Sequence, residues 1–316
     1  MLACSYTYTI KNTWIFFFLL TAFTLSVWPQ AKEDKSIEES RQAVKTLTPL
    51  GEHMPEQKTG DWLDLYYEAG QTFEQYIKAV KIPLDPQRKT IYIRPVGNFT
   101  PTQRKIEQAV AEFLGVFYNL PVKPQSAISL ENIPGMARRK NPLAGNDQIL
   151  TRYILEEKIF PTLPKDTAAY LAFSTCDLWT GDDNNFVFGE ASSDDPVGIW
   201  SMARYGDPDS SKEAFQRCLL RALKVATHET GHMFGLMHCT MHLCCMNGYN
   251  NLAEEDSHPL AFCPECIAKV CLITKTDIKD HCRRVAKFLR DHGFDDEALR
   301  YEAYLKVLDG FSTHNR

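Results

Sequence analysis

Apolar and polar positions recur with two different periods between residues 86 and 206, and this predicts both strands and helices. Residues 89–96 (KTIYIRPV) alternate β-branched or aromatic residues with polar ones, which is typical of a strand. From residue 101 apolar side chains recur at helical spacing, until residues 119–121 (NLP) end the helix. Residues 168–179 (AAYLAFSTCDLW) are a short apolar run, which predicts a buried strand.

The same alternation continues on both sides of that run. Residues 121–130 predict a second strand, and residues 147–160 predict an amphipathic helix. Two more strand-like runs, 185–192 and 197–206, are separated by a turn-forming Asp-Asp-Pro sequence. A long helix is predicted from about residue 210 into the sequence HETGH. Strands alternating with helices predict an α/β fold with a mixed sheet, against which this helix packs.

The N-terminal part of the chain has a different pattern. Residues 14–28 (WIFFFLLTAFTLSVW) are continuously apolar or small. This run is shorter than the ~20 residues that comfortably span a membrane, and its length is typical of the apolar region of a secretory signal peptide. A membrane anchor, a wrongly assigned start and a buried segment are the alternatives. We therefore treat residues 1–31 as an apolar leader, separate from the fold.

Residues 32–85 are polar, with helical stretches in which Trp62, Leu63, Tyr66, Phe73 and Tyr76 form an apolar stripe. This pattern predicts an N-terminal helical extension that packs on a larger body. Prolines near its end mark a break in the chain. The expected organisation is therefore a leader (1–31), an extension (32–85) and a main domain (86–310).

Composition adds limits to this picture. The chain has 316 residues, of which 44% are hydrophobic and 24% charged, as in a globular protein with a core. Its formal net charge of -5 gives no basic excess for nucleic acid. Of its ten cysteines, seven lie between Cys239 and Cys282. Clustering beside histidines favours a metal site over a disulfide scaffold.

The sequence HETGHMFGLMH (228–238) places three histidines and a glutamate at fixed spacing. On a helix His228 and His232 lie on one face, so both rings can bind one ion. His238 lies six residues further on, where a continuing helix would rotate it away. Gly235 can take a positive φ, end the helix and turn the chain back, so that His238 becomes the third ligand.

Three histidine ligands and an open position suit a catalytic zinc ion, which makes bound water acidic enough to ionise near neutral pH. Glu229 stands beside the first histidine and is the expected general base. The expected reaction is hydrolysis of an amide bond, in which Glu229 takes the water proton and passes it to the leaving amine.

The cysteines that follow suggest a second metal site. Cys239 and Cys244 form a C-x4-C pair, and Cys263 and Cys266 form a C-x2-C pair. Four thiolates make a closed tetrahedral zinc site, whose role is structural. Two disulfides are the alternative for an exported chain, and Cys245 is a substitute for Cys244. Cys271 and Cys282 are expected to be spare thiols.

The sequence HETGHMFGLMHC, followed by C-x-M and FCPEC, resembles the archaemetzincins, zinc peptidases of the metzincin clan. Residues 177–192 and 197–206 extend this resemblance, which covers roughly residues 88–310. It implies a metzincin-like catalytic domain with a mixed, mostly parallel sheet, an active-site helix and a C-terminal helical subdomain that holds the Cys4 zinc site. It also implies two zinc ions per chain, and Met246 as the methionine of the Met-turn beneath the catalytic zinc.

The expected function is a zinc metallopeptidase acting on peptides or proteins. The alternative is a catalytically weak or idle zinc protein that binds peptides or a protein partner. Residues 186–191 are the candidate edge strand that aligns substrate. We expect a monomer that binds no nucleic acid. It would be secreted or membrane-anchored through residues 14–28 if that segment acts as a signal, and cytoplasmic otherwise.

Overall fold

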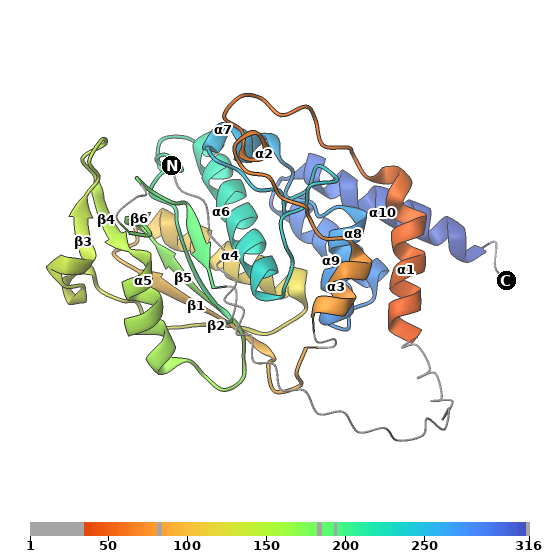
Figure 1. Cartoon of the computed structure of the whole chain (residues 1–316), viewed down its shortest axis with the longest axis horizontal. Coiled ribbons are helices and arrows are strands. Elements are labelled where there is room, and N and C mark those ends of the chain that lie inside the picture. Colours follow the sequence, from red (N-terminus) through yellow and green to blue (C-terminus); the bar gives the residue numbers. More distant parts are fainter. Residues whose placement is uncertain (1–34, 81–83, 182–184, 193–194, 314–316) are drawn as a thin grey trace, which may run out of the picture.

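The computed structural model describes residues 35–80, 84–181, 185–192 and 195–313, which form two β-sheets and the helices around them (Figure 1). The larger sheet has the strand order β2-β1-β5-β8-β7. Its members are β1 (Thr90–Val96), β2 (Val122–Pro124), β5 (Thr167–Ser174), β7 (Gly189–Ala191) and β8 (Val197–Ser201). Only β7 runs antiparallel, at the edge of the sheet, so the mixed, mostly parallel sheet is confirmed.

Burial explains the strand patterns of this sheet. All eight residues of β5 are buried, as a central parallel strand with both faces covered requires. On one face Ile91 and Leu171 join a core that includes helices α4 (Pro101–Tyr118) and α6 (Lys212–Met233). The rings of Tyr92 and Tyr170 stack on the other face, with centroids 5.6 Å apart. The sheet therefore forms the middle layer of the domain.

A second, three-stranded sheet corrects part of the prediction for residues 147–160. Its strands are β3 (Arg138–Lys140), β4 (Asp147–Leu150) and β6 (Asp177–Trp179), in the order β3-β4-β6. Residues 147–150 are thus a strand, and helical turns begin only at Thr151, as α5 (Thr151–Tyr153), the π-helical η4 (Ile154–Ile159) and η5 (Phe160–Thr162). The apolar run 168–179 also divides, because β5 and β6 belong to different sheets.

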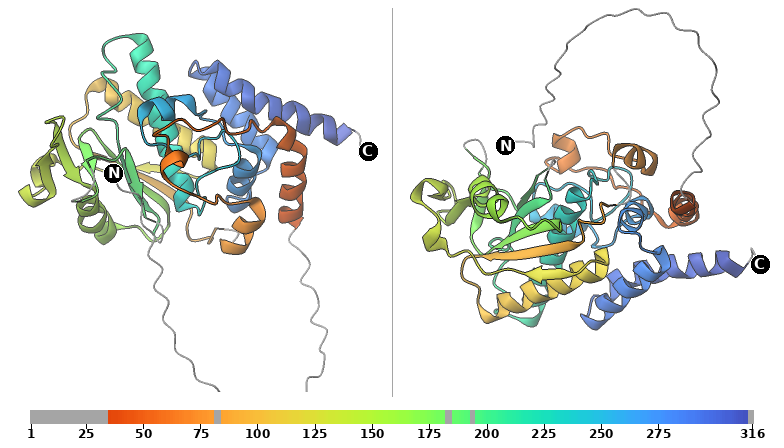
Figure 2. Two further views of the ribbon diagram at one scale, coloured as in Figure 1. Left: turned by 45° about the horizontal axis from the view of Figure 1, so that its top comes forward. Right: turned by 90° about the horizontal axis from the view of Figure 1, so that it is seen from below.

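Helices form the C-terminal part of the chain. They are α7 (Leu252–Ser257), α8 (Pro264–Ile273), α9 (Ile278–Asp291) and α10 (Asp295–Thr313). Helices α8, α9 and α10 lie together on the side away from the three-stranded sheet (Figure 2), whereas α7 lies nearer the middle, beside α6 and α2 (Trp62–Leu65) (Figure 1). Phe113 and Phe117 of α4 pack against Phe288 and Phe262, with ring centroids 4.9 and 4.8 Å apart. The expected C-terminal helical part therefore shares one core with the sheet and α6.

The N-terminal extension packs on this body. It contains α1 (Lys35–Leu47), η1 (Thr48–Leu50), α2 (Trp62–Leu65) and α3 (Phe73–Ala79). The apolar stripe is divided between two short helices, because the chain turns between them with a positive φ of 69° at Gly70. Leu47 and Tyr76 are fully buried, and α1 lies beside α8 and α10 (Figure 1). Two short 3-10 helices, η2 (Leu130–Asn132) and η3 (Gly135–Ala137), complete the elements.

The predicted leader, with its apolar run at residues 14–28, lies outside the described residues. Within the described ranges, no helix is both long and apolar enough to cross a membrane.

Candidate active site

Helix α6 carries the first two histidines of the motif. Its N-terminus is capped by the Ser211 side chain, which accepts a hydrogen bond from the Ala214 N–H. The helix then continues unbroken to Met233, so His228 and His232 lie one turn apart on the same face. Their Nε2 atoms are 2.9 Å from each other. These two nitrogens are therefore close enough to bind the same metal ion.

The chain turns back immediately after α6. Gly235 has a φ of 82°, in the left-handed region. The N–H of Leu236 donates to the Gly231 carbonyl at 3.0 Å, so a carbonyl in the last turn of the helix has a hydrogen-bond partner. This turn brings the His238 ring centroid to 5.2 Å from that of His228. The turn predicted from the glycine is present, and the candidate nitrogens of the three histidines lie within 4.8 Å of one another.

The opposite nitrogen of each ring has an acceptor. Nδ1 of His228 is 2.8 Å from the Cys245 carbonyl oxygen, and Nδ1 of His232 is 2.8 Å from that of Leu236. Nδ1 of His238 is 2.9 Å from both carboxylate oxygens of Glu68. Because these oxygens only accept, each Nδ1 carries the proton and each Nε2 keeps a free lone pair.

Burial keeps two of these rings neutral. It holds the pKa of His228 well below the ordinary value and lowers the pKa of His232 to about 3. Neutral imidazoles with converging lone pairs are the form that binds a divalent transition metal. The residues present therefore fit a three-histidine zinc site.

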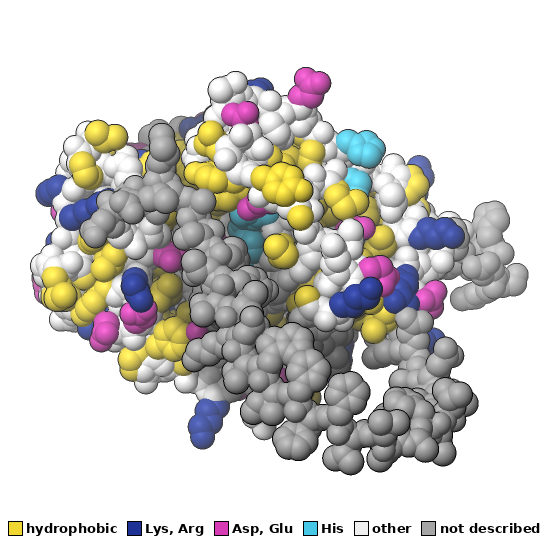
Figure 3. Space-filling model, viewed as in Figure 1, with side chains coloured by type: hydrophobic (Ala, Val, Ile, Leu, Met, Phe, Trp, Pro, Cys, Tyr) yellow, Lys and Arg dark blue, Asp and Glu magenta, His cyan; other side chains and the backbone are white. Residues whose placement is uncertain are grey.

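Glu229 lies between this cluster and the edge strand. A Cβ atom on Gly189 of β7 would come within 2.7 Å of the Glu229 Oε1, so the absence of a side chain there makes room for the carboxylate. Burial, and then the charge of Glu190, raises the pKa of Glu229 to about 8. Figure 3 shows histidine side chains recessed in this face of the molecule, with hydrophobic side chains around them.

The cysteines form a second cluster. The Sγ atoms of Cys239, Cys244, Cys263 and Cys266 all lie within 4.8 Å of one another. Cys239 and Cys263 are 3.7 Å apart, and the cysteines among the described residues are free, so none of these four forms the alternative disulfides. The N–H groups of Met246 and Cys263 donate to the Cys244 Sγ at 3.4 and 3.2 Å, an arrangement that stabilises a thiolate.

The remaining cysteines stay outside this cluster. Cys245 points to α6, where its thiol donates to the Lys224 carbonyl at 3.5 Å. Cys271 on α8 and Cys282 on α9 are buried elsewhere. Cys244, and not Cys245, is thus the member of the cluster.

The sequence pattern did not reveal Asn247 and Glu68. The Asn247 side chain donates to the Cys239 and His242 carbonyls at 2.6 and 2.8 Å, and accepts the Cys244 N–H at 2.6 Å. It thereby holds the loop between the two clusters. Beside it, Met246 is fully buried, and a Cβ on Gly231 would lie 2.6 Å from its sulfur. Met246 therefore lies directly against the helix that carries the histidines.

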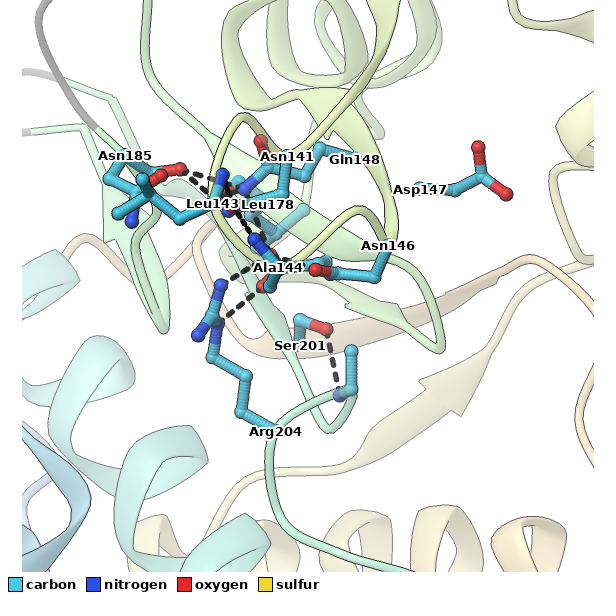
Figure 4. A network of polar contacts seen from close by, with 12 residues as sticks. Asn141, Leu143, Ala144, Asn146, Asp147, Gln148, Leu178, Asn185, Ser201 and Arg204 are labelled. Atoms are coloured by element: carbon cyan, nitrogen blue, oxygen red, sulfur yellow. Dashed lines mark hydrogen bonds and ion pairs between the residues drawn. The ribbon is translucent and has the colours of Figure 1, made fainter.

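A polar network supports the segment that leads into β7 (Figure 4). The Asn185 carbonyl accepts from Gln148 at 2.8 Å and from Arg139 at 3.1 Å. Asp177 accepts from Gln148 at 2.8 Å and from Arg204 through both carboxylate oxygens, at 2.8 and 2.7 Å. These bonds are buried or partly buried, so they fix where the edge strand begins.

The chain is similar to known proteins of one peptidase family. A model of the family described as peptidase family M54 matches residues 177–271. Archaemetzincin-2 of Homo sapiens is 30% identical over 302 residues, which cover 84% of this chain and 81% of that protein. Archaemetzincin-2 of Rattus norvegicus is 33% identical over 264 residues, covering 73% and 72%. A crystal structure of archaemetzincin from Methanopyrus kandleri aligns with a TM-score of 0.46 at 26% identity, covering 59% of this chain and 94% of that one.

Proposed function

The chain belongs to the archaemetzincins, a family of zinc metallopeptidases, and on this basis we propose that His228, His232 and His238 bind its catalytic zinc ion while Glu229 acts as general base. As a metallopeptidase it is a hydrolase, and its substrates are peptides or proteins. One observation carries the assignment of residues. The three imidazoles converge through Nε2, while an acceptor holds each Nδ1.

The proposed reaction divides the chemistry between the metal and the protein. A zinc ion held by His228, His232 and His238 would supply a Lewis acid, able to polarise a carbonyl and to make water nucleophilic. Glu229 accepts the proton of the attacking water and donates it to the leaving amine, so that the carboxylate is restored at the end. The positive charge of a metal ion bound by the three neutral histidines would favour the carboxylate form of Glu229 and oppose the effect of burial on its pKa.

We also propose that β7 aligns the substrate. Gly189–Ala191 form the edge of the five-stranded sheet and pair with β8 on one side only within that sheet. Backbone groups of an edge strand can pair with an extended peptide. Because Gly189 lies against Glu229, a peptide paired along this edge would pass beside the general base.

The second zinc ion belongs to the same proposal. Cys239, Cys244, Cys263 and Cys266 would hold it in a closed site, with no position open for water. Its role is structural, since these cysteines join the segment after His238 to the start of α8. On this proposal each chain binds two zinc ions. The monomeric state and a membrane anchor at residues 14–28 stay predictions.

The first prediction separates a peptidase from an idle zinc protein that only binds peptides. We expect Glu229→Gln to lower the peptide turnover rate by ~10²–10⁴-fold, the usual contribution of a general base. Both zinc ions should remain, because Glu229 is not a ligand. Turnover of a mixed peptide library and zinc per chain are the measurements.

Glu213→Gln is the matched control, because Glu213 lies in the first turn of the same helix and is exposed. It should leave both turnover and zinc content unchanged. If the parent chain carries two zinc ions and hydrolyses none of the peptides, the idle zinc protein is the correct description. If Glu229→Gln hydrolyses peptides as fast as the parent does, Glu229 is not the base.

A further inference from the structure

The third histidine is held differently from the first two. His228 and His232 lie on a rigid helix, and the acceptors of their Nδ1 protons are backbone carbonyls of residues 245 and 236, close by in the chain. His238 lies on the turn after the helix. Its acceptor is the side chain of Glu68, which is 170 residues earlier. The orientation of this ring therefore depends on a segment outside the motif.

Glu68 belongs to a segment that we call the N-terminal strap, residues 61–73, which includes α2 and the turn before α3. Two backbone N–H groups anchor the strap at its ends. That of Trp62 donates to Glu254 at 2.8 Å, and that of Phe73 donates to Glu265 at 2.8 Å. Both acceptors lie in the C-terminal helical part. Glu68 is therefore held in place between two fixed points.

The strap also contacts the turn that carries His238. The Gln71 side chain donates to the Gly235 carbonyl at 3.1 Å, and Lys269 of α8 donates to the Gln71 carbonyl. The Trp62 ring stands edge-on to the His238 ring, with centroids 5.3 Å apart. The imidazole is thus fixed by a hydrogen bond on one atom and by packing on its side.

The Glu68 carboxylate is suited to this contact. Both of its oxygens lie 2.9 Å from the Nδ1 atom of His238, so the carboxylate accepts the proton on that nitrogen. A carboxylate that accepts the Nδ1 proton of an imidazole fixes the tautomer and makes Nε2 a stronger ligand.

We propose that Glu68 is a positioning residue for the catalytic metal site, and that the N-terminal strap thereby completes a centre whose ligands all lie elsewhere. This proposal rests on the proposed function, because it requires a metal at the three histidines. Glu68 touches neither metal nor substrate and acts through His238. The N-terminal extension then contributes to metal binding at the active site as well as to the fold.

The test compares three variants of the full chain. Glu68→Ala removes the acceptor, whereas Glu68→Gln keeps an acceptor oxygen and removes the charge. Glu74→Ala is the control, because Glu74 lies on α3 of the same extension and pairs only with Arg41 among the ion pairs found there, at 2.6 Å. Zinc affinity is measured by competition with a chelator. Cobalt(II) absorption distinguishes the two sites, since only thiolate ligands give an intense sulfur-to-metal band.

We expect Glu68→Ala to weaken zinc binding at the histidine site by ~10–100-fold, and Glu68→Gln to weaken it less. The cobalt spectrum of the histidine site should shift in Glu68→Ala, while the thiolate band stays unchanged. Glu74→Ala should behave as the parent does in both measurements.

Two results would overturn the proposal. One is an unchanged zinc affinity and cobalt spectrum in Glu68→Ala. The other is an equal loss in Glu68→Ala and Glu74→Ala, because the packing of the extension, and not the carboxylate, would then be responsible. A parent chain that binds no metal at the histidines would instead contradict the proposed function, so the two failures are distinguishable.

Discussion

Among single residues, Gly235 is constrained in two ways, by its backbone conformation and by a close neighbour. Its φ of 82° lies in the region that side chains disfavour, at ~1–2 kcal/mol for a residue with a Cβ. A Cβ there would also approach the Val80 Cγ2 to 2.6 Å, closer than atoms in van der Waals contact. Val80 is the C-cap residue of α3 in the N-terminal extension. The turn that delivers His238 is therefore pressed against that extension.

We expect Gly235→Ala to lower the free energy of unfolding by ~2–5 kcal/mol, as the sum of backbone strain and overpacking. Zinc affinity at the histidine site should fall as well, because a shifted turn moves His238. Urea denaturation and chelator competition are the measurements.

Gly293→Ala is the matched control for this change. Gly293 follows α9 and has a φ of 76°, but a Cβ there meets only the Gln216 amide nitrogen at 3.9 Å. It should show the strain alone, ~1–2 kcal/mol, and normal zinc affinity. Equal destabilisation by both substitutions would mean that the contact with Val80 has no effect.

Single residues of the site differ in how far the sequence could predict them. The three histidines and Gly235 lie within eleven residues, so helix periodicity and one glycine are enough to predict that their rings converge. Their role as ligands stays a prediction. Glu68 could not be predicted in this way, because no local pattern links it to a histidine 170 residues later.

Among the elements, the loop between α6 and α8, which includes the short helix α7, connects the histidine cluster to the cysteine cluster. Its start carries His238 and Cys239, and its end is Cys263, which is the N-cap of α8. The Cys239 N–H donates to the Met246 carbonyl at 2.7 Å, so the loop folds back on itself. A metal held by the four cysteines would fasten both ends of this loop.

We therefore expect Cys263→Ser to remove one zinc ion per chain and to destabilise the loop and α8 by several kcal/mol, because metal binding here is also folding energy. Binding at the histidine site should weaken too, since the same loop carries His238. Zinc per chain and thermal unfolding are the measurements.

Cys245→Ser is the control, because Cys245 is buried in the same loop but points to Lys224. It should keep both zinc ions. Loss of zinc in Cys245→Ser with retention in Cys244→Ser would show that the two adjacent cysteines have been assigned in the wrong order.

Elements also show where periodicity misleads. The long helix α6 and the strand β1 match their predicted spans closely, since each has many residues and a clear period. Residues 147–150 were predicted as helix and are the strand β4. Ile149 and Leu150 come four residues before Tyr153 and Ile154, which are helical. The apolar positions of the strand and of the helical turns therefore fit one continuous helical spacing. Pairing of β4 with β6 decides the outcome, and that contact is not local.

At the scale of the whole molecule, the N-terminal extension wraps around the part that carries both clusters. Near its middle, the Leu243 N–H of the cysteine loop donates to the Glu52 carbonyl at 2.8 Å. Near its end, the Tyr76 hydroxyl donates to the Phe234 carbonyl at 2.9 Å, beside the histidine turn. The apolar stripe predicted packing of this kind. It could not indicate the partner, because several faces of the main domain are apolar.

The last prediction concerns removal of this extension. Deletion of residues 1–83 would expose buried contacts of Leu47, Phe73 and Tyr76, each worth ~1.5–3 kcal/mol. Their sum approaches the ~5–15 kcal/mol of net stability that a whole protein has. We expect this shortened chain to be insoluble or to unfold without a cooperative transition. Deletion of residues 1–34 leaves every contact described here intact, so that chain should fold, bind zinc and hydrolyse peptides. Calorimetry, zinc per chain and peptide turnover compare the two. A chain beginning at residue 84 that unfolds cooperatively with two zinc ions bound would show that the main domain is complete without its extension.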